Sequence, residues 1–227
     1  MRLPYFLEIA RTAERGYLDA LFFADTLTIA GQGGRGTLEP LTLLAALAAT
    51  TERIGLIATA STTYTEPFNL ARTFASLDHL SSGRIGWNIV TSSAADAAAN
   101  FGREEMPHER RYRRADEYLD VVTRLWDSWA DAARILNKET GIALAPGRAN
   151  AIDYLGQEFQ VRGPLNVPRS PQGHPVLVQA GSSPDGRAFA ARWAEVVFTA
   201  AQTLADAQGF YSDLKARVAV LGRDPNW

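Results

Sequence analysis

Cysteine is absent from this chain of 227 residues, which excludes disulfide bonds, thiolate metal sites and a cysteine nucleophile. Histidine is scarce, and because His79, His108 and His174 lie far apart in the sequence, no metal site is expected. The chain also lacks an excess of either charge, since 23 basic and 25 acidic side chains leave a net charge of -2. A nucleic-acid-binding protein usually carries a basic excess, so nucleic acid is not an expected partner.

Long apolar runs are missing as well. The opening residues, MRLPYFLEIARTAERG, lack the apolar core of a signal peptide, and no later run is long enough to cross a bilayer. The hydrophobic content of 46% and the charged content of 21% are typical of a globular protein with a sizeable core. We therefore expect a single domain over residues 1–227, located in the cytoplasm and without a membrane partner.

One βαβ unit organises the chain, with strands expected at 54–61 and 84–92 and a helix at 67–80 between them. Both strands begin with apolar residues and become rich in hydroxyl and amide groups toward their carboxyl ends. Ligands bind at the carboxyl ends of parallel strands, so this polarity predicts a binding face. Strands can also become polar simply because they enter loops, but the repetition in two successive strands favours a site.

The remaining elements continue the alternation. Helices are expected at 4–15, 39–51, 107–129, 181–194 and 203–221, and strands at 19–25, 175–180 and 195–200. The Gly-rich stretch 27–40 does not lead straight into a helix and is interpreted as a surface loop rather than a phosphate cradle, and 93–107 as a loop over the carboxyl face. Residues 131–175 break the rhythm and are interpreted as an irregular insertion with a small hairpin around 152–161.

This alternation predicts a parallel α/β sheet, either an eight-fold barrel or an open doubly wound sheet. Roughly five strands are expected, whereas a closed barrel has about eight strands and typically ~250 residues. The chain therefore looks short at both ends.

The junction GSSPDGR, between a strand and a helix, is the most specific local feature. Gly181 permits a tight turn, and Ser182 and Ser183 place hydroxyls and amides at a helix N-terminus. The helix dipole and the free N–H groups there favour a phosphate. An ordinary serine N-cap is the alternative, and it is the commoner use of such residues.

Four further side chains could contact a ligand, and each has a structural alternative. Asp25 could touch a ligand or cap backbone amides, and Asn88 could bind a heterocycle or anchor a loop. His108 and Tyr112 share a helix face and could hold a phosphate or a ring, or be satisfied by neighbours. No recognisable catalytic set is present, so no catalytic residue is assigned. This inventory suits a protein that holds a cofactor with its own chemistry.

Several segments in a specific order carry a family resemblance: FFADTL, residues 39–92 with IATAS and WNIVTS, HERRYRRADEY and QAGSSPDGR. In these the chain resembles the bacterial luciferase-like flavin monooxygenases, in the branch of nitrilotriacetate monooxygenase and dibenzothiophene-sulfone monooxygenase. The resemblance implies a TIM (β/α)8 barrel of the luciferase-like type. Here the barrel would be incomplete, because the first strand and the last βα units of the family are missing.

The resemblance also implies an FMNH2-dependent two-component monooxygenase, which uses dioxygen to oxygenate a small organic substrate. A separate NAD(P)H-dependent flavin reductase would supply the reduced FMN. Asp25 and Thr59 would lie by the flavin, with a cis peptide near Ala58–Thr59. The full set of implied cofactor contacts is Asp25, Thr59, Asn88 (facing the isoalloxazine), and His108, Tyr112, Ser182 and Ser183 (holding the phosphate).

Alternatives remain at this stage. The chain could be a non-catalytic flavin-binding remnant, or a deazaflavin-dependent oxidoreductase on the same fold. Aminopolycarboxylates, organosulfur compounds and alkyl chains are all candidate substrates. An open barrel would expose apolar strand edges that drive association, so a homodimer or higher oligomer is expected.

Overall fold

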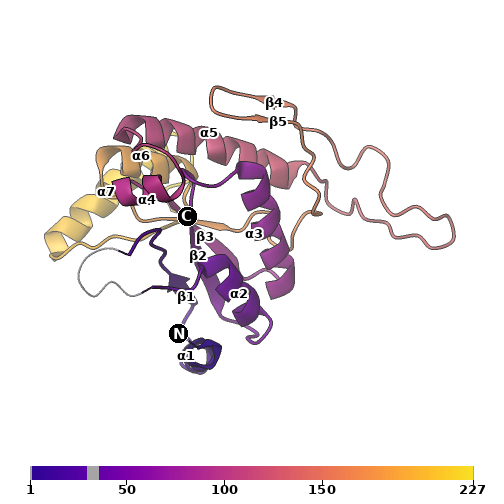
Figure 1. Cartoon of the computed structure of the whole chain (residues 1–227), viewed down its shortest axis with the longest axis horizontal. Helices are drawn as coiled ribbons and strands as arrows, with labels where there is room; N and C mark the ends of the chain where they lie inside the picture. Colours follow the sequence, from indigo (N-terminus) through magenta and orange to yellow (C-terminus); the bar gives the residue numbers. More distant parts are fainter. Residues whose placement is uncertain (1, 30–35, 227) are drawn as a thin grey trace.

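A curled sheet of five parallel strands forms the centre of the computed structural model, which describes residues 2–29 and 36–226 (Figure 1). The strands lie in the order β1-β2-β3-β6-β7. Their bounds are β1 Ala20–Phe23, β2 Gly55–Ser61, β3 Ile85–Val90, β6 Val176–Gln179 and β7 Val196–Val197. The rings of Phe22 in β1 and Phe198 directly after β7 lie 6.4 Å apart, so the curl brings the two edges toward each other. A closed barrel needs about eight strands, so the prediction of an incomplete α/β barrel is confirmed for the described residues.

Helices alternate with the strands and lie around the outside of the sheet (Figure 1). They are α1 Leu3–Arg15, α2 Pro40–Ala48, α3 Pro67–Ser81, α5 His108–Asp127, α6 Pro184–Trp193 and α7 Leu204–Val220. These bounds agree with the predicted helices to within a few residues. The surface loop expected over 27–40 lies partly outside the described residues, at 30–35.

The stretch 93–107 differs from the predicted loop because it contains a short helix, α4 Ala95–Asn100. Ala97 and Ala98 of α4 are buried against Tyr64, whose ring stacks on that of Phe101 with centroids 4.5 Å apart. Alanine has the highest helix propensity, and these alanines also give the segment an apolar face to bury. Its small polar neighbours had suggested a loop.

Trp87 in β3 anchors the core between the sheet and the helices. Its ring centroid lies 5.5 Å from that of Phe74 in α3, and 6.0 and 6.5 Å from those of Tyr118 and Trp126 in α5. The indole N–H donates to the carbonyl of Ala60 at 3.1 Å. Side chains alternate along a strand, so the residues on either side of Trp87 face the interior of the curl.

The insertion between α5 and β6 contains the expected hairpin, formed by β4 Tyr154–Leu155 and β5 Gln160–Val161. The carboxylate of Glu117 in α5 accepts hydrogen bonds from three backbone N–H groups of the turn, those of residues 157, 158 and 159. One acidic side chain therefore holds the hairpin on α5. The preceding part of the insertion extends away from the barrel (Figure 1).

Arg84, directly before β3, closes the amino-terminal end of the sheet. Its guanidinium donates to the carbonyl oxygens of Ala48, Thr51, Ile54 and Ser81 over distances of 2.7 to 3.1 Å. Ala48 and Ser81 are the last residues of α2 and α3, where carbonyls lack intrahelical partners. A single side chain therefore satisfies the ends of two helices and the loop between α2 and β2.

Replacing Arg84 with methionine should lower the free energy of unfolding by about 3 kcal/mol, because several partly buried carbonyls lose their donor. Arg84→Lys should recover little, since an ammonium lacks the planar fork of donors. Urea denaturation measures both changes. The matched control is Arg72→Met on the exposed side of α3, which should change stability by less than ~0.5 kcal/mol. Equal losses at the two positions would contradict this role of Arg84.

Glu14 links α1 to the start of β2. Its carboxylate accepts hydrogen bonds from the backbone N–H groups of Glu52, Arg53 and Ile54. These bonds hold the pKa of Glu14 below its ordinary value of 4.5, and the bond from Arg53 has the largest effect. A carboxyl group with a lowered pKa stabilises the fold above its unfolded value and loses that contribution as the pH falls through the folded value.

Glu14→Gln should therefore lower the free energy of unfolding at neutral pH, and the difference from the unmodified chain should shrink below about pH 4.5. Urea denaturation at a series of decreasing pH values measures the difference. A gap that stays constant into the acidic range would show that the charge of Glu14 does not contribute.

Candidate functional site

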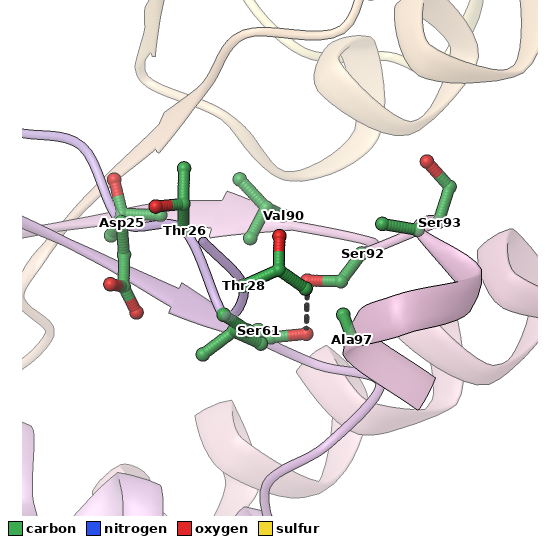
Figure 2. A pocket seen from close by; sticks show the side chains of 11 residues that line it. Asp25, Thr26, Thr28, Ser61, Val90, Ser92, Ser93 and Ala97 are labelled. Carbon is green, nitrogen blue, oxygen red and sulfur yellow. Dashed lines mark hydrogen bonds between the residues drawn. The ribbon is translucent and has the colours of Figure 1, made fainter. Parts of the chain in front are cut away.

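A cavity of about 380 Å³ opens at the carboxyl ends of β2 and β3, where the sequence predicts a binding face. Figure 2 shows the loop after β1, which carries Asp25 and Thr28, beside the ends of these strands. The lining is made of Asp25, Thr26, Leu27, Thr28, Thr59, Ser61, Val90, Ser92, Ser93, Ala94 and Ala97. Six of these residues carry a hydroxyl group, and none of them carries a basic side chain. The cavity is therefore suited to a polar group that accepts hydrogen bonds, and less to a phosphate.

Asp25 lies at one side of this cavity. Burial is the main cause that raises the pKa of its carboxyl group above the ordinary value of 3.8, and the carboxylate of Glu39 adds to it. The N–H of Thr26 opposes both effects. Glu39 is fixed nearby because it caps α2, accepting from the N–H groups of Leu41 and Thr42. The carboxylate of Glu39 therefore lies close enough to Asp25 to disfavour its charged form.

Thr59 and Asn88 form a buried pair on β2 and β3, and each is only 4% exposed. The parallel register sets them side by side, and Asn88 Nδ2 donates to Thr59 Oγ1 at 2.9 Å. Thr59 lines the cavity, whereas Asn88 is not among its lining residues. Asn88 Oδ1 has no partner among the described residues. A buried acceptor without a donor costs stability and calls for an explanation, such as a functional role.

The prediction of a cis peptide bond near Ala58–Thr59 is wrong. Among the described residues the structure has a cis bond only at Gly163–Pro164. The ladder between β2 and β3 runs without interruption from Leu56 to Ser61. Regular parallel pairing of every residue in this stretch accounts for the trans geometry.

The GSSPDGR junction connects β6 to α6 as predicted. Ser183 is the N-cap of α6, and its hydroxyl accepts from the N–H of Gly186 at 3.0 Å. A Cβ atom on Gly186 would lie 2.9 Å from the backbone of Gly181, and one on Gly181 would lie 3.1 Å from the hydroxyl of Tyr112. The absence of Cβ atoms therefore lets the two glycine backbones approach each other in a turn beside Tyr112, which we call the cradle. Ser182 is exposed at the same turn.

His108, the first residue of α5, lies against the start of α6. Its Nε2 atom is 3.0 Å from the carboxylate of Asp185, and about half of each side chain is exposed. Its ring centroid lies 5.0 Å from that of Tyr112, whose ring contacts Phe189 of α6 edge-on at 6.0 Å. Asp185 thus pairs with His108, the side chain that the sequence analysis predicts to hold a phosphate.

The structure brings the predicted site residues together in two groups. Asp25, Thr59 and Asn88 gather at the cavity, and His108, Tyr112, Ser182 and Ser183 gather at the cradle between α5 and α6. Both groups lie at carboxyl strand ends, of β2 and β3 for the first and of β6 for the second. Their roles toward a cofactor stay predictions.

Three polar residues of this region were not assigned from the sequence. The hydroxyl of Ser92, just after β3, donates to that of Ser61 at the end of β2, and the two oxygens are 2.8 Å apart (Figure 2). The third residue, Asp185, pairs with His108. The hydroxyl-rich strand ends were the available signal for the two serines. Asp185 had none, because an acidic residue in the first turn of a helix is ordinary.

Measurements of stability can separate the role of Ser183 as the N-cap of α6 from its predicted role as a phosphate contact. Ser183→Ala should lower the free energy of unfolding by about 1 kcal/mol through loss of the N-cap, whereas Ser183→Asp should retain most of it, because aspartate caps equally well. Chemical denaturation of the two variants measures the cap. An alanine variant as stable as the unmodified chain would show that the N-cap contributes nothing.

Among the described residues no cluster of histidine, aspartate or glutamate could hold a metal ion. Within the same part of the chain, none of the helices is long and apolar enough to cross a membrane.

Comparisons with known proteins agree on one family. The family model described as luciferase-like monooxygenase matches residues 1–226. The chain is 55% identical to N-acetyl-S-(2-succino)cysteine monooxygenase of Bacillus subtilis (strain 168), over 99% of this chain and 52% of that relative. It is 53% identical to nitrilotriacetate monooxygenase component A of Aminobacter aminovorans, over 97% of this chain and 52% of that relative.

A solved structure of riboflavin lyase, with modified FMN and riboflavin, superposes with a TM-score of 0.93 at 36% identity. The match covers 99% of this chain and 53% of that one. The chain spans about half the length of the curated relatives it matches. On the family model and these identities, the chain belongs to the luciferase-like monooxygenase family.

Proposed function

We propose that this chain carries the flavin-binding part of an FMNH2-dependent two-component monooxygenase. The observation that carries the proposal is the pairing of a hydroxyl-lined cavity with a glycine and serine cradle at neighbouring carboxyl strand ends. Such an arrangement suits a ligand with a planar polar ring at one end and a phosphate at the other. The family to which the chain belongs supports the same conclusion.

The residues at the cradle fit the phosphate of FMN. The N-terminus of α6 offers backbone N–H groups and the positive end of the helix dipole. Because Gly181 and Gly186 lack Cβ atoms, their backbones approach each other closely, and the Tyr112 hydroxyl lies beside Gly181. Ser182 and Ser183 would add hydroxyl groups, and His108 would add a positive charge when protonated.

The residues at the cavity fit the isoalloxazine ring. Thr59 lines the cavity, Asn88 donates a hydrogen bond to its hydroxyl, and Asp25 lines the same cavity. When bound, reduced FMN supplies the two electrons with which dioxygen delivers one oxygen atom to the substrate and one to water. The chain's own residues would orient the ring in the cavity, where burial raises the pKa of the Asp25 carboxyl group.

Partners follow from this chemistry. A separate NAD(P)H-dependent flavin reductase would supply FMNH2, and its dependence on NAD(P)H places the system in the cytoplasm. The substrate would be a small organic molecule. A homodimer or higher oligomer would cover the apolar side chains near the sheet edges, among them Phe22 at 43% and Phe198 at 59% exposure.

An anaerobic titration with reduced FMN tests the proposal. The unmodified chain should bind saturably, and Tyr112→Phe should weaken binding several-fold by removing one donor. Ser183→Asp keeps the N-cap but places a negative charge at the phosphate, so it should weaken binding more than tenfold while the fold stays stable. Asp185→Asn should strengthen binding, because it frees His108 and removes a competing carboxylate. The control is Ser76→Ala, on the outer side of α3.

The outcomes separate the candidate functions. Absence of flavin binding by a folded chain would sink the proposal, as would preferential binding of a reduced deazaflavin over reduced FMN. The five-stranded sheet supports one second candidate, a chain that binds flavin without transferring oxygen. Saturable FMNH2 binding, with no oxygenated product from candidate substrates in the presence of a reductase, would favour that second function.

A further inference from the structure

Ser61 has a hydrogen-bond arrangement that fixes what it can offer to a ligand. Its hydroxyl oxygen accepts from the hydroxyl of Ser92 at 2.8 Å and from the backbone N–H of Thr63 at 3.2 Å. A serine oxygen has two lone pairs and one proton to give. Because both lone pairs are engaged, the Ser61 hydroxyl can only donate to a further group. Among the described residues no acceptor for that proton is recorded.

Thr59 lies two residues earlier on the same face of β2, and its hydroxyl also has a proton to donate. It accepts from Asn88 Nδ2 at 2.9 Å, which uses one lone pair and leaves its proton without a recorded acceptor in the described chain. Thr59 is 4% and Ser61 5% exposed, and both line the cavity. Figure 2 shows the Ser61 and Ser92 side chains meeting at the cavity wall.

Two neighbouring hydroxyl groups are therefore held as donors toward one cavity, by partners on β3 and in the segment that follows it. Preorganised donors of this kind stabilise an electron-rich group without reorganisation when it binds. The phosphate is not that group, because Asp25 shares the cavity and the cradle of α6 provides the anion-binding geometry elsewhere. The flavin ring remains, with its carbonyl oxygens and N1 as acceptors.

We propose that Thr59 and Ser61 donate to the flavin ring and set a preference for reduced over oxidised FMN, with Asn88 and Ser92 as positioning residues. The proposal rests on the proposed function, since it concerns the same flavin. Two-electron reduction makes the ring carbonyls and N1 more electron-rich, and hydrogen-bond donors favour the more negative form. The chain would then retain the form of the cofactor that a reductase delivers, and release the oxidised form.

The test compares dissociation constants for oxidised FMN and, under anaerobic conditions, reduced FMN. The unmodified chain should bind the reduced form more tightly. The measured ratio is the dissociation constant for oxidised FMN divided by that for reduced FMN. Ser61→Ala and Thr59→Val should each lower this ratio about tenfold, the size of one hydrogen bond to a charged group. A tenfold fall equals a decrease of about 30 mV in the midpoint potential of the bound flavin. Thr59→Ser keeps the hydroxyl and should keep the ratio.

The positioning residues are tested through a double-mutant cycle. Ser92→Ala should lower the ratio less than Ser61→Ala does, and should have no further effect in a Ser61→Ala background. Ser92 is less buried than Ser61, so this variant also serves where a change at Ser61 prevents folding. Ser76→Ala, which removes a hydroxyl bonded to a carbonyl on the outer side of α3, is the matched control and should leave the ratio unchanged.

The possible failures are distinct. Equal weakening of both forms would overturn the proposal, because the hydroxyls would then shape the cavity without sensing the redox state. A higher ratio in the variants, which means relatively tighter binding of reduced FMN, would overturn it too. The donors would then contact a ring atom that accepts hydrogen bonds only in the oxidised form. Absence of any flavin binding by the unmodified chain would overturn both this inference and the proposed function.

Discussion

The parallel pairing of β2 with β3 is the constraint on which the rest of the structure depends. It places Trp87 toward the helices and, one residue later, Asn88 toward the interior, where it meets Thr59. The same alternation that buries an indole beneath α3 and α5 therefore delivers the Thr59 hydroxyl to the cavity and places the Asn88 amide against it. A slip of one residue would exchange the two faces and would destroy the core and the site together. Core packing and ligand binding are consequently set by one register.

Polar groups at the two ends of the sheet have different partners. At the amino-terminal end, Arg84 and Glu14 provide partners for the carbonyl and N–H groups of the helix ends and loops. At the carboxyl end, Asn88 Oδ1 and Gln179 Oε1 are buried without partners in the described part of the chain. A buried polar group without a partner reduces stability and calls for an explanation, and a bound ligand would supply one for these two.

Local patterns allowed most of the fold to be predicted from the sequence. The strand polarity, the alternation of strands and helices and the glycine at the turn after β6 act over short stretches of sequence, so the element bounds were close. The site was predicted only in part. Whether Ser61 donates depends on Ser92, 31 residues away, and His108 meets Asp185 only after α5 and α6 pack. The helix α4 was missed because its alanines gain from burial against Tyr64, a contact that sequence spacing does not reveal. The cis peptide came from resemblance alone, and regular pairing of β2 overrides it.

The central claim is that one ligand joins the cavity at β2 and β3 to the cradle at the start of α6. A crystal structure of the chain grown with FMN tests it most directly. The account predicts the phosphate at the N-terminus of α6, within hydrogen-bond distance of Ser183, and the ring in the cavity beside Thr59 and Ser61. A flavin bound elsewhere, or one whose phosphate lies away from α6 while its ring leaves the two hydroxyls uncontacted, would contradict it.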